Sequence, residues 1–223
     1  MHYDGSQWTD ATGTLTSLAS GFFDVSGENA NDFWLAAYQT IVHYNNGVWT
    51  QYAIGDSMLM TRVWEGSNGV YAIGYKISAG ANFTALYRLS GGAFGIVDQT
   101  TFYNGKFEIA ALWSSGNSIF TAWNEIESAQ LTSSGGVNSG SWQVIVMLPS
   151  GGYIDRAFYY DSKDVWLVGY PNLLYHYNGT DWQEITITVD GKPAPPGEYS
   201  ACWTDGNQIF VCDDNNGIIY HGR

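Results

Sequence analysis

The sequence predicts an all-β protein, and three observations support this fold class. Hydrophobic residues make up 45% of the 223 residues and aromatic residues 16%, while only 13% are charged, a balance that excludes disorder and a solvated helical bundle. Short runs rich in Val, Ile, Tyr, Phe and Trp alternate with turns built from Asn, Asp, Ser and 27 glycines, as antiparallel strands do. No stretch combines an amphipathic helical period with capping residues.

Aromatic residues recur along the whole chain at a nearly fixed interval. One series follows a Gly- or Ser-containing turn and is spaced 41, 45, 48 and 40 residues apart: Trp8, Trp49, Phe94, Trp142 and Trp182. A second series closes short apolar runs: Phe23, Trp64, Trp113, Tyr160 and Trp203. A third lies in the run that follows: Trp34, Tyr71, Phe120, Trp166 and Phe210. Three aromatic positions that each recur five times indicate an internal repeat.

Each repeat contains four strand-like runs, which in one copy are IDRAFYY, DVWLVGY, NLLYHYNG and DWQEITITV (within residues 154–189). Four-stranded units with a period of about 40–50 residues are typical of β-propellers. Five such units predict a single domain over 1–223 that forms a five-bladed propeller of four-stranded antiparallel blades. The approximate repeat units are 2–42, 43–86, 87–131, 132–174 and 175–223.

The motif DVWLVG (164–169), followed by LLYHYNGTDW (173–182), resembles the repeat of bacterial propeller proteins. DFWLAA (32–37) and IVHYNNGVW (41–49) follow the same pattern. The resemblance implies a propeller fold and a secreted or surface-attached protein, so we expect an extracellular or cell-surface location. It implies no activity, because this repeat is a scaffold for proteins of many functions.

The two ends of the chain predict how the ring closes. The chain finishes with a third-run segment, GIIYHGR (217–223), and begins with HYDGSQWTD (2–10), the end of a third run followed by a fourth. The N-terminal strand is therefore expected to join the C-terminal blade as its outer strand and cover an exposed sheet edge. His2 and His221 occupy the same repeat position, so part of one strand is present twice.

Charge limits the partners. Eight Lys and Arg residues against 21 Asp and Glu residues give a net charge of −13, which disfavours nucleic acid and anionic membranes as ligands. No apolar run approaches the length of a membrane span, and residues 1–20 lack the pattern of a signal peptide. Cys202 and Cys212 flank a predicted hairpin and form either a disulfide or two buried thiols. The sequence predicts no cofactor and leaves the oligomeric state open.

The turns between the second and third runs contain a candidate ligand-binding site. Aromatic rings stack on the C–H faces of sugars. Asn side chains donate hydrogen bonds to the hydroxyls and accept from them, and Asp carboxylates accept from them. The residues of this predicted site are Tyr38, Tyr75, Trp123, Tyr170, Asn124, Asn172, Asp213 and Asp214. This repeated pattern favours a lectin-like protein with several weak sites; the alternative is that the rings only seal the strand ends.

Two sets of acidic residues provide further alternatives. Glu108, Asp155 and Glu198 each precede a closing aromatic by five residues, and paired carboxylates at a channel mouth would fit a glycoside hydrolase. Asp24, Glu28 and Asp32 gather in one turn but lack the spacing of a calcium loop. The histidines share one repeat position and are interpreted as structural, so no catalytic set is expected.

The sequence thus favours a non-catalytic binding or interaction propeller with a glycan as its ligand. A protein partner is the second interpretation, in which the domain docks within a larger surface or phage-type protein. Glycoside hydrolysis is the third.

Overall fold

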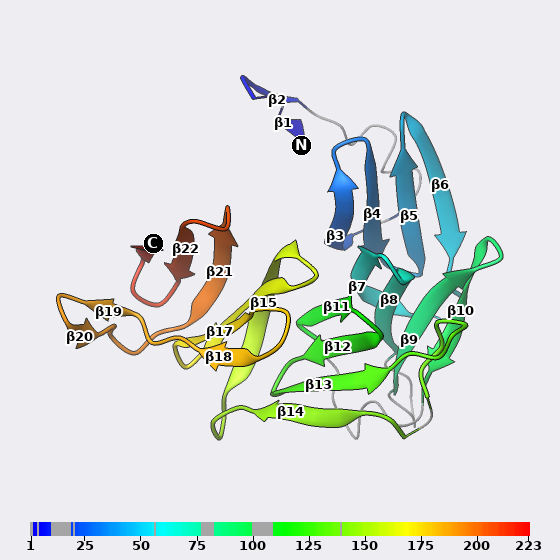
Figure 1. The fold of residues 1–223 in the computed structure, drawn as a ribbon. Helices are drawn as coiled ribbons and strands as arrows, with labels where there is room; N and C mark the ends of the chain where they lie inside the picture. The colour runs from blue at the N-terminus through cyan, green and yellow to red at the C-terminus, as the bar shows by residue number, and fades with distance from the viewer. Residues whose placement is uncertain are drawn as a thin grey trace. The chain divides into compact units, whose positions relative to one another are not determined.

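The computed structural model describes residues 2–3, 5–9, 19, 21–55, 57–76, 83–99, 109–138 and 140–223. Contacts divide the chain into two compact units, residues 1–65 with 69–107 and residues 66–68 with 108–223, and each is described by itself. Every regular element among the described residues is a β-strand (Figure 1). The all-β prediction is therefore confirmed. The part of the chain that the structure describes contains no helix that could span a membrane.

The first unit contains two four-stranded antiparallel sheets and an N-terminal hairpin. The sheets have the strand orders β3-β4-β5-β6 and β7-β8-β9-β10. The strand bounds are β1 (His2–Tyr3), β2 (Trp8–Thr9), β3 (Phe22–Asn29), β4 (Asp32–Ala37), β5 (Thr40–Asn45), β6 (Val48–Ala53), β7 (Leu59–Gly66), β8 (Gly69–Lys76), β9 (Phe83–Ser90) and β10 (Ala93–Asp98).

The second unit contains two four-stranded sheets, a three-stranded sheet and a short hairpin. The strand orders are β11-β12-β13-β14, β15-β16-β17-β18, β21-β22-β23 and β19-β20. The strand bounds are β11 (Ala111–Ser115), β12 (Ser118–Ala122), β13 (Glu125–Gln130), β14 (Gln143–Met147), β15 (Tyr153–Asp161), β16 (Asp164–Tyr170), β17 (Leu173–Tyr177), β18 (Trp182–Glu184), β19 (Thr188–Val189), β20 (Lys192–Pro193), β21 (Tyr199–Thr204), β22 (Ile209–Asp213) and β23 (Ile218–Gly222).

The predicted fourth run 181–189 is shorter than expected. Strand β18 ends at Glu184, and the chain then forms the β19–β20 hairpin. Asp190 and Gly191 both have positive φ, 51° and 75°, which is the backbone of a tight two-residue hairpin turn. The Val-Asp-Gly-Lys sequence therefore forms a turn of its own and ends the longer strand.

The described N-terminal residues form a short hairpin. Among the described residues β2 pairs with β1, with Tyr3 opposite Trp8, and the C-terminal sheet has three strands. Since the first and second units are each described by themselves, the addition of this strand to the C-terminal blade stays a prediction. The number of five blades remains a prediction.

Aromatic and branched side chains form the core of each unit. In the first unit Trp34 packs with Met60, Val63 and Ala72, and in the second Trp113 is fully buried. Burying one such ring contributes about 1.5–3 kcal/mol. Trp34, Tyr71 and Phe120 of the third aromatic series are buried, whereas Phe23, Tyr160 and Trp203 of the second series are exposed.

For Tyr160 the difference arises because β-bulges shift the register. Trp113 lies opposite Phe120 and Phe158 lies opposite Trp166, so Phe158 is the structural equivalent of Trp113, and the predicted Tyr160 lies two residues further along. One extra residue in a bulge changes the count without changing the apolar pattern.

Candidate binding surface

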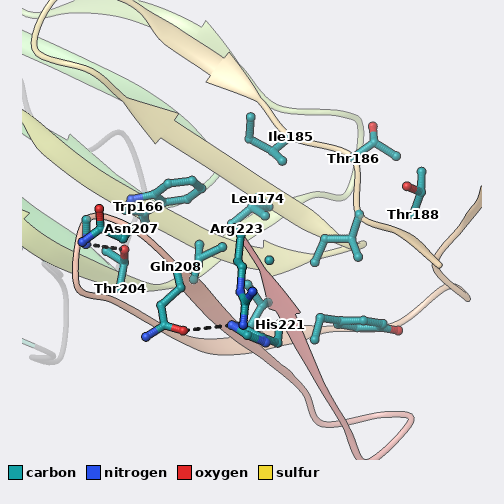
Figure 2. Close-up of a pocket in the computed structure, with 16 residues that line it drawn as sticks. Trp166, Leu174, Ile185, Thr186, Thr188, Thr204, Asn207, Gln208, His221 and Arg223 are labelled. Carbon is teal, nitrogen blue, oxygen red and sulfur yellow. Dashed lines mark hydrogen bonds between the residues drawn. The ribbon is translucent and has the colours of Figure 1, made fainter.

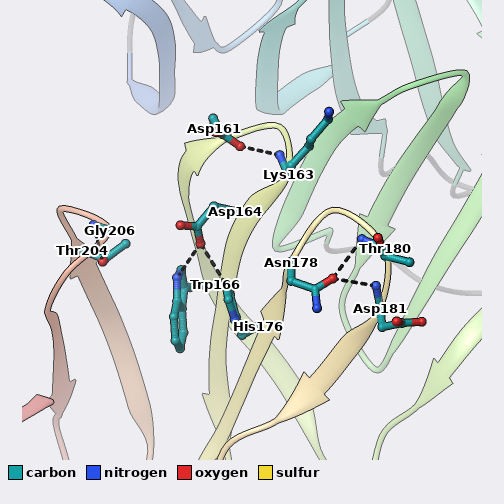
Figure 3. Close-up of polar contacts among 10 residues, drawn as sticks. All are labelled: Asp161, Lys163, Asp164, Trp166, His176, Asn178, Thr180, Asp181, Thr204 and Gly206. Carbon is teal, nitrogen blue, oxygen red and sulfur yellow. Dashed lines mark hydrogen bonds and ion pairs between the residues drawn. The ribbon is translucent and has the colours of Figure 1, made fainter. Parts of the chain in front are cut away.

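The histidines form a structural motif that is repeated within the sheets. His176 contacts Asp164 Oδ1 through Nε2 at 2.9 Å, and the Trp166 indole N–H donates to the same oxygen at 2.8 Å (Figure 3). The Trp166 and His176 rings stack at 4.0 Å between centroids. The carboxylate therefore fixes both rings at the start of β16, which is a packing role.

The same arrangement occurs in the first unit. His43 contacts Asp32 at 2.7 Å and stacks on Trp34 at 3.8 Å, while the Asn45 side chain donates to the second oxygen of Asp32 at 2.7 Å. In the C-terminal sheet a glutamine takes the acidic position, because His221 contacts Gln208 Oε1 at 3.0 Å.

Asp24 and Asp32, two of the three acidic residues considered as a calcium site, contact different parts of the sheet. Asp24 accepts a hydrogen bond from the Val63 backbone at 3.0 Å and lies opposite Ala36 in the sheet. Asp32 lies near the other end of the same strand pair and is engaged by the His43 motif. The side chain of Glu28 lies outside the described part. No group of three or more potential metal ligands occurs among the described residues.

Two of the predicted turn tyrosines are exposed. Tyr38 and Tyr170 directly follow β4 and end β16, with exposed fractions of 45% and 41%. Tyr75 instead lies within β8, opposite Thr84, and is half-buried. Trp123 is half-buried as well. Of the predicted turn aromatic residues, Tyr38 and Tyr170 are therefore the exposed ones.

The polar members of the predicted site differ in what they contact. Asn172 holds the 195–199 segment: its side-chain amide donates to the Pro195 carbonyl at 2.7 Å and contacts the Tyr199 hydroxyl at 3.1 Å, and its carbonyl accepts from the Gly197 N–H. Asp213 is only 2% exposed and accepts from the Asn216 backbone and side chain.

These interactions give Asn172 and Asp213 a structural role. Asn124 and Asp214 are exposed, so they are accessible to a ligand.

Tyr153, at the start of β15, brings the aromatic and acidic predictions together. Its ring stacks with Tyr170, with centroids 5.8 Å apart, and its hydroxyl donates to Glu198 Oε1 at 2.8 Å. The hydrogen bond to Glu198, together with burial and the nearby charges of Glu198 and Asp155, raises the pKa of Tyr153 to about 12. The sequence did not single out Tyr153, although it sits at the repeat position that Glu198 occupies just before β21.

The bulges also explain how Asp155 and Glu198 are related. Asp155 is the extra residue between Ile154 and Arg156 in β15, and Ser200 has the same place in β21. Asp155 and Glu198 are thus not equivalent repeat positions, contrary to the five-residue count. Asp155 contacts the Arg156 guanidinium at 3.4 Å. Glu108 lies outside the described residues.

A pocket lies beside the residues that follow Tyr170. A pocket of about 320 Å³ is lined by Pro171, Asn172 and Tyr199 and by residues of the 184–196 segment. Together, Tyr153, Tyr170, Asp155 and Glu198 form what we call the Tyr153–Tyr170 surface, a ring pair beside two carboxylates. Such a surface offers an apolar face and hydrogen-bond acceptors to one ligand.

The strand order and the repeated motif define a β-propeller-like protein. Its solved structural neighbours are β-propeller proteins. "YCF48 bound to D1 peptide" has a TM-score of 0.56 at 16% identity and covers 96% of this chain and 68% of that one. The extracellular domain of the putative hybrid two-component system BT4673 from B. thetaiotaomicron has a TM-score of 0.61 at 14% identity.

The match to BT4673 covers 92% of this chain but 27% of that one. An oligogalacturonate lyase in complex with manganese has a TM-score of 0.56 at 9% identity, covering 87% of this chain and 62% of that one. At these identities the likeness concerns the fold. No protein-family model matches the chain, and no curated protein matches it.

Proposed function

We propose that this chain is a non-catalytic binding domain and that the Tyr153–Tyr170 surface recognises carbohydrate. The observation that carries the proposal is the exposed Tyr170 ring stacked on Tyr153, whose hydroxyl is held by Glu198. A pair of rings fixed by a hydrogen bond loses little conformational entropy when a sugar stacks on it. The carboxylates of Asp155 and Glu198 supply acceptors for its hydroxyls.

Binding to a polyvalent glycan would extend this function to several sites. Tyr38 is the second exposed turn tyrosine, and weak sites on one molecule gain avidity on a repeated ligand. A surface or extracellular location agrees with such a ligand and is part of the proposal.

A protein partner is the second candidate, and one comparison favours it. The structure named "YCF48 bound to D1 peptide" is a neighbour that holds a peptide. An acidic chain with a net charge of −13 would suit a basic segment, whose cations pair with carboxylates and lie over tyrosine rings. Glycoside hydrolysis by Glu108, Asp155 and Glu198 is the third candidate, and it requires two carboxyl groups about 5–10 Å apart.

A glycan array followed by titration calorimetry tests the proposal. Tyr170→Ala should weaken binding of a positive glycan about tenfold, because one aromatic contact contributes about 1–1.5 kcal/mol. Tyr160→Ala is the matched control, since Tyr160 is an exposed tyrosine of the same strand pair, 54% exposed, that lies outside the surface. Equal affinities of these two variants, or an array without a positive glycan, would overturn the carbohydrate proposal.

The array-positive glycan also separates binding from hydrolysis. Incubation with the wild-type chain should release no reducing ends. Product formation that is lost in Glu198→Gln would replace the binding proposal with the hydrolase.

A further inference from the structure

Asn172, in the turn between β16 and β17, holds the chain on both sides of Glu198. Its side-chain amide donates to the Pro195 carbonyl at 2.7 Å and to the Tyr199 hydroxyl at 3.1 Å. Its side-chain carbonyl accepts from the Gly197 N–H, and its backbone N–H donates to the Gly197 carbonyl at 3.0 Å. One residue of the second unit therefore fixes the segment before and after Glu198.

The turn between β22 and β23 holds the same segment. The Asn216 side-chain amide donates to the Pro196 carbonyl at 3.2 Å and to Asp213 Oδ2 at 2.9 Å. The Asp214 N–H donates to the Glu198 carbonyl at 3.1 Å. The backbone of Glu198 is thus bonded to this turn directly.

Gly197 allows this turn to approach the segment closely. A Cβ at this position would lie 2.5 Å from Asp213 Oδ1 and 2.7 Å from Asn216 Nδ2, so a side chain there would force the segment away from the turn. On the other side of Glu198, Tyr199 is buried, with 1% of its surface exposed. Glu198 therefore lies between two residues that have little freedom to move.

The chain that leads into this segment is fixed as well. The Ile185 N–H donates to the Leu174 carbonyl at 2.8 Å, and the Ala194 N–H donates to the Ile187 carbonyl at 2.9 Å. Figure 2 shows Ile185 and Leu174 in the wall of a pocket of about 500 Å³. Ile185, Ile187 and Ala194 also pack against the buried cluster that contains Tyr199. The 195–199 segment is therefore held at its start and along its length.

Glu198 connects this segment to the ring pair. Its Oε1 accepts from the Tyr153 hydroxyl at 2.8 Å, and the Tyr153 ring stacks on Tyr170. A bond between a hydroxyl and a carboxylate needs its two oxygens within about 3 Å, so a displacement of Glu198 by about 1 Å would break it. Tyr170 lies two residues before Asn172. The turn that carries the exposed ring therefore also fixes the carboxylate that holds the neighbouring ring.

We propose that Asn172 is a positioning residue of the Tyr153–Tyr170 surface: it acts by clamping the 195–199 segment so that Glu198 holds the Tyr153 ring. This inference rests on the proposed function of the surface, but the hydrogen bond through which Asn172 acts can be measured without a ligand. Rings that are already ordered lose less conformational freedom when a ligand stacks on them, so the clamp raises the affinity.

Asn172→Gly is the variant that isolates the side chain. Asn172 has a φ of 52°, and glycine adopts this backbone readily, so the substitution removes the side-chain contacts and keeps the turn. Asn46→Gly is the matched control, because Asn46 is a turn asparagine of the first unit with a φ of 46°.

The Tyr153 hydroxyl reports the position of Glu198. We expect Asn172→Gly to lower the pKa of Tyr153 from about 12 toward 10, measured by tyrosinate absorbance against Tyr153→Phe, and Asn46→Gly to leave it unchanged. Near-UV circular dichroism over the same pH range confirms that each variant stays folded. NMR of the Tyr153 hydroxyl proton at pH 7 gives a readout without alkali, because the proton should exchange faster with water in Asn172→Gly.

A double variant separates positioning from general stability. Glu198→Ala removes the acceptor, so adding Asn172→Gly to it should cause no further change in the pKa of Tyr153. Additive changes would show that Asn172 acts on Tyr153 by another route and would overturn the proposal.

The array-positive glycan provides the second readout. Asn172→Gly should bind it about fivefold more weakly than the wild type, and Asn46→Gly should bind it equally well. An unchanged Tyr153 titration and an unchanged hydroxyl exchange in Asn172→Gly would overturn the positioning role, whether or not a glycan binds. Unchanged glycan affinity despite a shifted titration would also overturn it. An array without a positive glycan would instead remove the carbohydrate function, and the titration alone would then decide whether Asn172 positions Glu198.

Discussion

Removing the carboxylate of Asp164 should destabilise the fold by about 3 kcal/mol. Its Oδ1 is the acceptor for both the Trp166 indole and the His176 ring, at 2.8 and 2.9 Å. Hydrogen bonds to a charged group contribute about 1.5–3 kcal/mol each. The Asp164 and His176 side chains are 27% and 25% exposed, so water replaces part of each bond in Asp164→Ala. Each bond is therefore counted at the lower end of that range, about 1.5 kcal/mol, which gives about 3 kcal/mol for the two.

Asp164→Asn is the matched variant, because both donors use the same oxygen. An amide oxygen in that place still accepts both bonds and loses only the charge, so we expect a cost of about 1 kcal/mol. Urea unfolding followed by tryptophan fluorescence measures both. With a slope of about 2 kcal/mol per molar urea, the midpoint should fall by about 1.5 M in Asp164→Ala and about 0.5 M in Asp164→Asn.

The reasoning fails if Asp164→Ala unfolds within about 0.5 kcal/mol of the wild type, or if the Asn variant is as unstable as the Ala variant. The first result would mean that ring stacking alone holds the motif. The second would mean that charge, and not hydrogen bonding to one oxygen, is what stabilises it.

Two further predictions concern Tyr153 and Gly169. The pKa of Tyr153 is raised from 10.0 to about 12, so the folded chain retains this proton to higher pH than the unfolded chain. The resulting stabilisation of the fold is complete below about pH 10 and is lost as the pH rises through 12. Glu198→Gln should return this pKa toward 10, which tyrosinate absorbance measures against a Tyr153→Phe reference, and an unchanged titration would contradict the hydrogen bond. Gly169→Ala should lower the free energy of unfolding by more than about 3 kcal/mol, since its Cβ would lie 2.0 Å from the Tyr153 carbonyl oxygen and 2.8 Å from Ile154 Cα. Gly95→Ala is the control: it has open space around its Cβ and should change the free energy of unfolding by less than about 0.5 kcal/mol. Equal effects of the two substitutions would refute the steric argument.

Periodicity was enough to predict the strands, because turn residues and apolar runs are local signals. The third aromatic series shows this well: Trp34, Tyr71 and Phe120 are buried in β4, β8 and β12. The structural role expected for the histidines agrees with His43 and His176, which each contact an acid and stack on a tryptophan.

Register could not be predicted to the residue, because a β-bulge leaves no strong mark in composition. Asp155 in β15 and Ser200 in β21 are the extra residues of two such bulges, yet one is acidic and the other is not. Counting from a distant aromatic residue therefore aligned Asp155 with Glu198. The polar contacts of Asn172 likewise depend on the 195–199 segment, whose path does not follow from the repeat.

The candidate site lies where the copies of the repeat differ. Tyr153 in β15 and Glu198 before β21 occupy the same repeat position, and because they differ, one donates a hydrogen bond to the other at 2.8 Å. Two carboxylates in those places would repel, and one of them would take up a proton. A repeat fixes the scaffold because every copy must pack in the same way, so a residue that departs from the repeat at a surface is released from that packing and becomes available for a ligand.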